Sequence, residues 1–195
     1  MTGFARVTGG DAPDIQFHAV PVQIVDEGTT DPTEHGMWVS PCLLQPESRG
    51  NVTLASNDPS AKPVIRHNYY AAERDMQVQM EGMRLLLEIM RQPAMGPYST
   101  PFTVPADETE DALREHIARH TTTLYHPVGT CAMGGVVDAE LRVNGVEGLR
   151  VVDASVMPMV PRGNTNAPTI AIAERAADLI RGRVGERAAE VAAPA

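Results

Sequence analysis

The first half of the chain alternates between apolar and polar positions, and a period of two predicts β-strands. Three short segments show this alternation, and turn-forming residues separate them. They are residues 15–25, 36–46 and 50–56. Because a parallel connection needs a longer crossover, strands that follow one another so closely predict an antiparallel sheet. Residues 1–13 show no period and are expected to form a loop or a frayed end.

After Asn68 the apolar positions recur every three or four residues, which predicts a helix over about 71–92. Its apolar stripe consists of Met76, Met80, Met83, Leu87 and Met90. Pro93 is expected to end this helix because proline cannot continue the backbone hydrogen bonding. A second helix is predicted further on, where Asp107 and Glu110 have the spacing of a capping box.

The last third predicts a hairpin and a closing helix. Residues 141–158 have the pattern of a hairpin, with a buried strand at Leu149–Val152. The helix is expected to begin near Pro168, a favoured first-turn residue, and to end at Arg181 before Gly182. Its expected inner face consists of Ala173, Ala176, Ala177 and Ile180. The predicted fold class is α+β, an antiparallel sheet with helices on one face followed by a C-terminal strand and helix.

Composition excludes several classes of protein. The formal net charge is −9 with no basic run, which argues against nucleic-acid binding and against docking on an anionic lipid surface. No apolar run approaches the roughly 20 residues that span a bilayer, and the N-terminus has no secretory pattern. Cys42 and Cys131 are too few for a disulfide framework. A cytoplasmic, reduced location is the expectation.

The stretch "LYHPVGTCAMGG" is the first candidate for chemistry. His126 stands before a proline and a group of glycines that let a ligand approach, and a neutral imidazole accepts a proton near physiological pH. A structural histidine in a turn is the alternative. The second candidate is "GNTNAPT", where Asn164 and Asn166 precede the last helix. Either one is a candidate N-cap, but a helix start also suits a group that becomes anionic.

Two other interpretations of these residues stay open. Cys131 lies five residues after His126, so a thiol–imidazole nucleophile pair is conceivable, although it needs an orienting third group. His116 and His120 lie four apart on a predicted helix, but the pattern lacks the acidic residue of the H-E-x-x-H metal motif. A solvated helix face is the favoured interpretation of these two histidines, and no metal is expected.

Taken together, "YHPVGTCAMG", "GLRVVDASVMP" and "GNTNAPTIAIAERAADLI" resemble the C-terminal region of the glucose–methanol–choline (GMC) oxidoreductases, closest to the choline and alcohol dehydrogenase branch. The resemblance covers residues 15–182. It implies a flavoenzyme that passes hydride from an alcohol to FAD, with His126 as base and Asn164 at a partner position that is His or Asn in the family. It also implies a set of cofactor-binding residues, namely Asp153, Ala154, Ser155, Asn166, Ala167 and Thr169.

The resemblance divides the chain into a substrate-binding portion (1–125), an active-site and FAD-contacting segment (126–182) and a frayed tail (183–195). No G-x-G-x-x-G motif occurs, so the chain is expected to be the C-terminal part of a GMC enzyme whose partner is the missing N-terminal FAD-binding half. A truncated gene, a partial reading frame and a split enzyme are the open alternatives. The implied substrate is a small alcohol. The electron acceptor, oxygen or a quinone-type carrier, stays open, and an acceptor in a membrane would bring weak membrane association. The competing hypothesis is a non-catalytic remnant or a subunit that completes another chain.

Overall fold

A computed structural model describes residues 2–24, 30–31, 35–98 and 104–183. The chain divides into two compact units, Met1–Leu124 and Tyr125–Ala195. The fold class is α+β, with antiparallel sheets and three α-helices among the described residues, as predicted. No helix of this part of the chain is long and apolar enough to cross a membrane. The predicted tail lies outside the described residues from position 184 onward.

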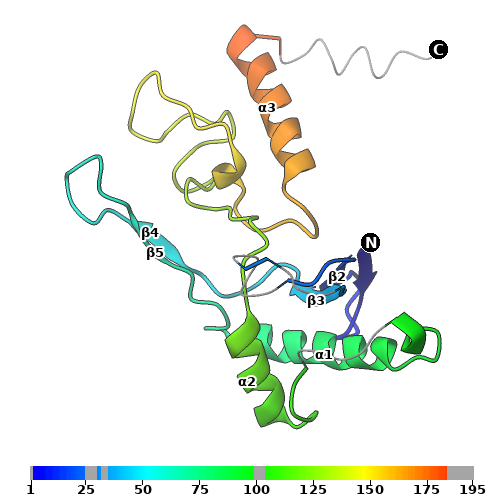
Figure 1. Ribbon diagram of the computed structural model, residues 1–195. Helices are drawn as coiled ribbons and strands as arrows, with labels where there is room; N and C mark the ends of the chain where they lie inside the picture. Colours follow the sequence, from blue (N-terminus) through cyan, green and yellow to red (C-terminus); the bar gives the residue numbers. More distant parts are fainter. Residues whose placement is uncertain (1, 25–29, 32–34, 99–103, 184–195) are drawn as a thin grey trace, which may run out of the picture. The chain divides into compact units, whose positions relative to one another are not determined.

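The first unit is built on a three-stranded antiparallel sheet with strand order β1-β2-β3 (Figure 1). The strands are β1 (Thr2–Ala5), β2 (Ile15–Val20) and β3 (Trp38–Leu43). The predicted segments 15–25 and 36–46 therefore contain β2 and β3. The prediction that residues 1–13 form no regular structure is wrong at β1. A strand of four residues carries too short a pattern to recognise, and β1 exists because it pairs with β2.

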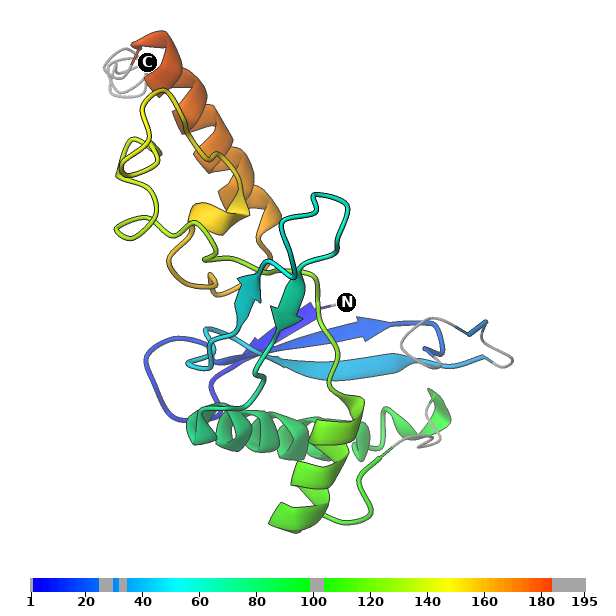
Figure 2. The ribbon, with the colours of Figure 1, turned by 90° about the vertical axis from the view of Figure 1, so that its left-hand side faces the viewer.

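A separate two-stranded ribbon consists of β4 (Asn51–Thr53) and β5 (Val64–Arg66). The predicted strand at 50–56 contains β4, but its partner β5 was not predicted. All six ribbon residues are exposed on both faces, so β5 shows no burial pattern that a sequence could reveal. Figure 2 shows the ribbon on the opposite side of the sheet from the helices of this unit.

Helix α1 (Glu73–Met90) covers one face of the sheet, as predicted for residues 71–92 (Figure 2). The helix comes close to the sheet at Gly82. A Cβ atom there would lie 2.8 Å from Cδ1 of Ile15 and 3.2 Å from Cβ of Pro41. Glycine is therefore required for the close approach of the helix. Pro41 itself is tolerated because β3 is an edge strand.

Helix α2 (Glu110–His120) packs against α1 and closes the core of the first unit. The buried cluster between the two helices consists of Met76, Met80, Leu113 and Ile117. The predicted capping box was wrong. Thr109 is the N-cap and its hydroxyl accepts from the backbone N–H of Ala112, while Asp107 accepts from Thr109. The helix begins later than the pattern suggested, because a threonine provided the first cap.

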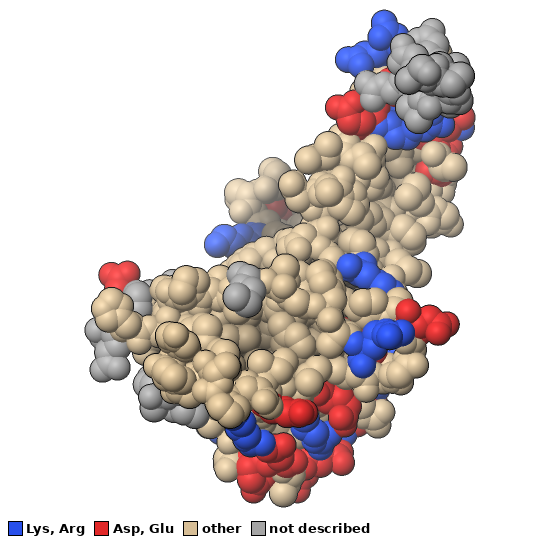
Figure 3. Space-filling model, turned by 90° about the vertical axis from the view of Figure 1, so that its right-hand side faces the viewer, with Lys and Arg blue, Asp and Glu red and all other residues tan. Residues whose placement is uncertain are grey.

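Buried and exposed charges join the elements of the first unit. Asp75 is 1% exposed, and its carboxylate accepts from the backbone N–H groups of Glu47 and Ser48 at 2.9 and 2.8 Å. This bond pair anchors the loop after β3 to α1. On the surface, Arg114 of α2 pairs with Glu73 of α1 and with Glu110. Acidic and basic side chains gather over these two helices, at the lower end of the view in Figure 3.

The stability of the fold is expected to fall between pH 7 and pH 5 because of His116. Burial, with the nearby His120 and Arg119, lowers the pKa of His116 below its ordinary value of 6.5. The unfolded chain therefore binds the proton more readily than the folded one, and stability present above 6.5 is lost as the pH falls. Urea unfolding at several pH values should show this slope. The variant His116→Gln should flatten it, whereas His35→Gln, at an exposed position, should not.

The second unit contains one long helix, α3 (Asn166–Arg181), and a short 3₁₀ turn, η3 (Ala154–Val156). Its core cluster consists of Val137, Leu141, Val156 and Ala176. The end of α3 at Gly182, with a left-handed φ of 72°, agrees with the prediction. The segment Leu149–Val152 differs from the expected strand. The described residues there form a single bridge, between Arg142 and Arg150, because no neighbouring strand extends the ladder.

The packed face of α3 also differs from the predicted one. Ala176 is 1% exposed as expected, but Ile180 is 62% exposed and Ala173 is also exposed. Ile172 packs against the core cluster instead. A run of small and apolar residues on every side of a helix leaves its orientation undecided, and tertiary contacts then choose the buried face.

Candidate functional site

The two segments singled out by the sequence meet in the second unit. His126 lies two residues after Leu124, where the first unit ends, and its ring is half-buried. Its neighbours constrain the backbone on both sides. Tyr125 has a φ of 59°, a left-handed conformation that is uncommon for an aromatic residue, and Pro127 disfavours a helical conformation for His126. The imidazole is therefore presented from a fixed, non-helical segment.

Both ring nitrogens of His126 are hydrogen-bonded by consecutive residues of the loop that leads into α3. Nε2 lies 2.8 Å from Nδ2 of Asn164, and Nδ1 lies 3.0 Å from Oγ1 of Thr165. Asn164 is exposed, whereas Thr165 is 8% exposed. The structure thus brings together the two residues assigned to the site, although they lie 38 positions apart in the sequence. Thr165 was not among the predicted site residues.

These contacts define the hydrogen-bonding state of the ring. An amide nitrogen donates and has no lone pair to accept with, so Nε2 accepts from Asn164. In the neutral ring the proton then belongs to Nδ1, which donates to the hydroxyl oxygen of Thr165. The lone pair of Nε2 is thereby the basic position of the site, and it points to the exposed carboxamide of Asn164.

The start of α3 presents backbone donors beside this pair. Thr165 is the N-cap, so neither Asn164 nor Asn166, the two candidate N-caps, holds that position. The side chain of Thr165 makes no capping bond, since it contacts His126 instead. The first turn leaves the N–H groups of Asn166 and Ala167 without helical partners, and Pro168 has no N–H. Thr169 has a structural bond, because its hydroxyl donates to the carbonyl of Thr165 at 2.7 Å.

The other predicted cofactor residues lie around η3. Asp153 is the N-cap of this turn, and its carboxylate accepts from the backbone N–H of Ser155 at 2.8 Å. The carbonyl of Ser155 accepts from the N–H groups of Gly129 and Cys131 at 3.1 and 3.0 Å. The segment that carries His126 is therefore tied to η3 as well as to the start of α3. All of the predicted site residues lie in the second unit.

The glycines near His126 form turns in the segment that carries it. Gly129 and Gly134 have φ values of 93° and 84°, which favour glycine over other residues. A Cβ atom on Gly134 would meet nothing within 4 Å, and one on Gly129 would make an ordinary contact with the carbonyl of Met157. These glycines allow the turns that place the histidine, and that they also make room for a ligand beside the ring stays a prediction.

The alternative chemistries find little support in the geometry. Both nitrogens of His126 are hydrogen-bonded to Asn164 and Thr165, and neither is bonded to the thiol of Cys131. The rings of His116 and His120 lie 4.6 Å apart. Among the residues that the structure describes, no group of three His, Cys, Asp or Glu side chains is arranged to hold a metal ion.

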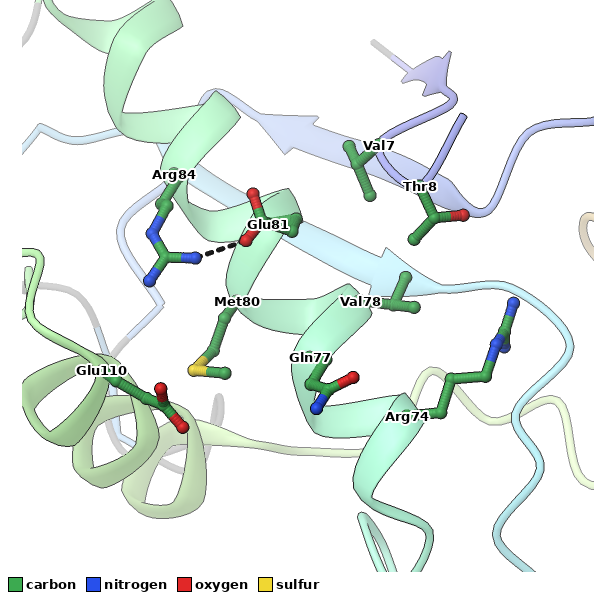
Figure 4. A pocket seen from close by; sticks show the side chains of 9 residues that line it. All are labelled: Val7, Thr8, Arg74, Gln77, Val78, Met80, Glu81, Arg84 and Glu110. Carbon is green, nitrogen blue, oxygen red and sulfur yellow. Dashed lines mark hydrogen bonds and ion pairs between the residues drawn. The ribbon is translucent and has the colours of Figure 1, made fainter. Parts of the chain in front are cut away.

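A hollow of about 470 Å³ lies in the first unit, between α1 and the loop after β1 (Figure 4). Its walls carry Arg74, Glu81, Arg84 and Glu110, and Figure 4 shows Arg84 paired with Glu81. Arg74 pairs with Glu47. Glu110 pairs with Arg114, so all four charges are compensated, and the lining contains no histidine or thiol. The hollow offers no catalytic group, so the site at His126 remains the candidate.

Comparison with known proteins identifies the family. The model of the GMC oxidoreductases, for their C-terminal domain, matches residues 46–173, which is more than half of the chain. This protein therefore belongs to the GMC oxidoreductase family. An oxygen-dependent choline dehydrogenase of Pseudomonas syringae pv. syringae (strain B728a) is 45% identical over 188 residues, or 93% of this chain and 33% of the relative. The chain thus spans about a third of the length of the curated relatives that it matches.

Solved structures of larger enzymes contain the same fold. Pyridoxine 4-oxidase from Mesorbium loti has a TM-score of 0.83 and 26% identity, and the similarity covers 93% of this chain and 37% of that one. A formate oxidase of Aspergillus oryzae RIB40, studied for the effect of a mutation on FAD modification, has a TM-score of 0.76 and 26% identity. The similarity covers 88% of this chain and 32% of the formate oxidase.

Proposed function

We propose that this chain carries the proton-accepting half of an FAD-dependent alcohol oxidoreductase. The observation that carries the proposal is the pair formed by Nε2 of His126 and Nδ2 of Asn164 at 2.8 Å. Membership of the GMC family and 45% identity to a choline dehydrogenase support it. In this proposal residues 1–125 form the substrate-binding portion, and residues 126–182 form the active-site and cofactor-contacting segment.

The residues at the start of α3 fit the negative charge of a reduced flavin. The N–H groups of Asn166 and Ala167 are not used by the helix, and the Thr165 side chain does not cap them. Together with the helix dipole, these donors favour an anion. We assign Asn166, Ala167 and Thr169, with Asp153, Ala154 and Ser155 around η3, to the cofactor. A bound FAD would accept the hydride from the alcohol carbon.

The proton chemistry is performed by the two residues of the pair. A substrate hydroxyl would replace the hydrogen bond between Nε2 of His126 and Nδ2 of Asn164, so that it donates to the ring and accepts from the amide. As the carbon loses hydride, the hydroxyl proton passes to Nε2 and the oxygen becomes a carbonyl. The amide N–H of Asn164 stabilises the negative charge that develops on that oxygen. The products are an aldehyde and a protonated histidine.

The substrate class is a small alcohol, and the relatives favour choline. These residues supply only part of the contacts that FAD needs, because no G-x-G-x-x-G loop for the FAD pyrophosphate occurs among the 195 residues. We therefore propose that catalysis needs a GMC dinucleotide-binding region as a partner. A non-catalytic role in completing another chain is the alternative, and it would not require the His126–Asn164 pair.

Co-expression with the dinucleotide-binding region of a choline dehydrogenase tests the proposal. The purified complex is expected to be yellow, and its flavin absorbance near 450 nm should bleach when choline is added without oxygen. The 195-residue chain alone is expected to be colourless, because most of the FAD contacts are absent from it. A complex that binds FAD but whose flavin no alcohol reduces would favour the non-catalytic alternative.

A further inference from the structure

Thr165 differs from an ordinary helix-capping residue. It holds the N-cap position of α3, but it is 8% exposed and its side chain makes no capping bond. Its backbone conformation is helical, with φ −84° and ψ −10°, whereas an N-cap is usually extended. The hydroxyl oxygen instead lies 3.0 Å from Nδ1 of His126. The side chain serves the imidazole rather than the helix.

We infer that Thr165 is a positioning residue that holds the ring of His126 in place and, together with the Asn164 amide donor at Nε2, favours the tautomer with the proton on Nδ1. The catalytic role of Thr165 rests on the proposed function, whereas its contact with His126 is observed independently of that function. In water a neutral histidine ring favours the tautomer with the proton on Nε2. In that tautomer Nε2 has no lone pair and cannot accept a proton. An acceptor at Nδ1 counters that preference, because the proton on Nδ1 gains a hydrogen bond to Oγ1 of Thr165, while the amide of Asn164 requires the lone pair at Nε2.

The contact stays useful while the ring changes charge. In the neutral ring Nδ1–H donates to Thr165 and the lone pair of Nε2 is available. When Nε2 takes the substrate proton, Nδ1 keeps its own proton and the same bond remains. The orientation of the imidazole is thus unchanged through the proton transfer. Asn164, in contrast, must exchange its partner, because a protonated Nε2 no longer accepts from an amide N–H.

The backbone and side chain of Thr165 have separate functions. Its carbonyl accepts from the backbone N–H of Thr169 at 3.0 Å and from the Thr169 hydroxyl at 2.7 Å, so it begins α3. The hydroxyl takes no part in these bonds. Replacing Thr165 by valine therefore keeps the shape and the helix start, and removes only the acceptor at Nδ1. Thr165→Ser restores the hydroxyl without the methyl group.

Nitrogen NMR of the histidine ring tests the inference directly. The 195-residue chain, labelled with ¹⁵N-histidine, is recorded at pH 8, where a histidine ring is ordinarily neutral. The His126 signals are assigned by their loss in His126→Gln. The unaltered chain should show Nδ1 protonated. Thr165→Val should move the ring toward protonated Nε2, and Thr165→Ser should return it to protonated Nδ1.

A protonated Nδ1 that persists in Thr165→Val would overturn the inference, as would a protonated Nε2 in the unaltered chain. Thermal unfolding of Thr165→Val close to that of the unaltered chain excludes a general loss of structure. Should this variant not fold, Thr165→Ala, which also lacks the hydroxyl, takes its place in the same measurement.

Kinetics of the FAD-containing complex separate the inference from the proposed function. Thr165→Val is expected to lower kcat about tenfold or more with little change in KM, because the wrong tautomer leaves fewer rings able to accept the proton. Thr165→Ser should recover most of the rate. A tautomer that shifts in Thr165→Val while His126→Ala keeps full activity would leave Thr165 as the positioning residue and refute the role of His126 as base.

Discussion

Replacing His126 by alanine is expected to lower the rate of flavin reduction by an alcohol about 10²–10⁴-fold in the complex with a dinucleotide-binding region. The variant loses the lone pair of Nε2 that accepts the hydroxyl proton, and water is a poor substitute at neutral pH. Anaerobic stopped-flow measurement of flavin bleaching gives the rate. The loss should appear in kcat rather than in KM, since the proton is transferred in the transition state.

A matched histidine elsewhere in the chain provides the control. His35 is exposed and lies in the first unit, so His35→Ala removes an imidazole without touching the pair. It should reduce flavin at the rate of the unaltered complex. If His126→Ala matched that rate, the proton would have another acceptor and the proposed mechanism would be wrong.

The helices of the first unit were predictable because their apolar period lies in local sequence. Met76 and Met80 form the inner stripe of α1 as expected, and both lie in the buried cluster with α2. The second buried side of α1, with Val78 and Leu86, was not predicted. That side faces the sheet, and no local pattern in the sequence reveals where the sheet lies. One buried face was therefore predicted for a helix that packs against both the sheet and α2.

Strands β2 and β3 were predictable from the alternation of apolar and polar residues in the sequence, although their burial does not alternate. In β2 both Ile15 and Gln16 are buried, and Val20 is exposed. In β5 all three residues are exposed, and in β1 the segment has four residues. Neither strand carries enough contrast along the chain, so pairing with a neighbour determines them. The opposite error occurred at Leu149–Val152. Its apolar run predicted a strand, but among the described residues it forms only the bridge between Arg142 and Arg150.

The candidate site was found through motifs, and its finer geometry was not. His126 and Asn164 could be singled out because the resemblance to the family covers both segments. Thr165 could not, because its role depends on a contact across 39 positions and on a helix cap that it fails to make. A threonine between two asparagines before a helix is an ordinary capping pattern, and the pattern does not indicate which atom its hydroxyl contacts.

Replacing Asn164 by alanine is expected to lower kcat about 10²-fold in the same complex, the typical loss when one donor to a developing oxyanion is removed. KM should change much less, because the bond between the amide N–H and the substrate oxygen strengthens as that oxygen becomes negative. The exposed Asn51 of β4 provides the matched control, and Asn51→Ala should leave both constants unchanged. A rise in KM with an unchanged kcat would show that Asn164 binds the alcohol without assisting the reaction.

Two further substitutions distinguish the donor from the shape of the side chain. Asn164→His offers a ring N–H to the same oxygen, as the resemblance to the family implies for other members, and should keep more activity than alanine. Asn164→Asp has nearly the shape of asparagine but presents two acceptors and a negative charge. It should be slower than Asn164→Ala, because the carboxylate repels the developing alkoxide and favours a protonated His126, which can no longer take the proton. Equal rates for the aspartate and histidine variants would mean that hydrogen-bond donation at position 164 plays no part in the reaction.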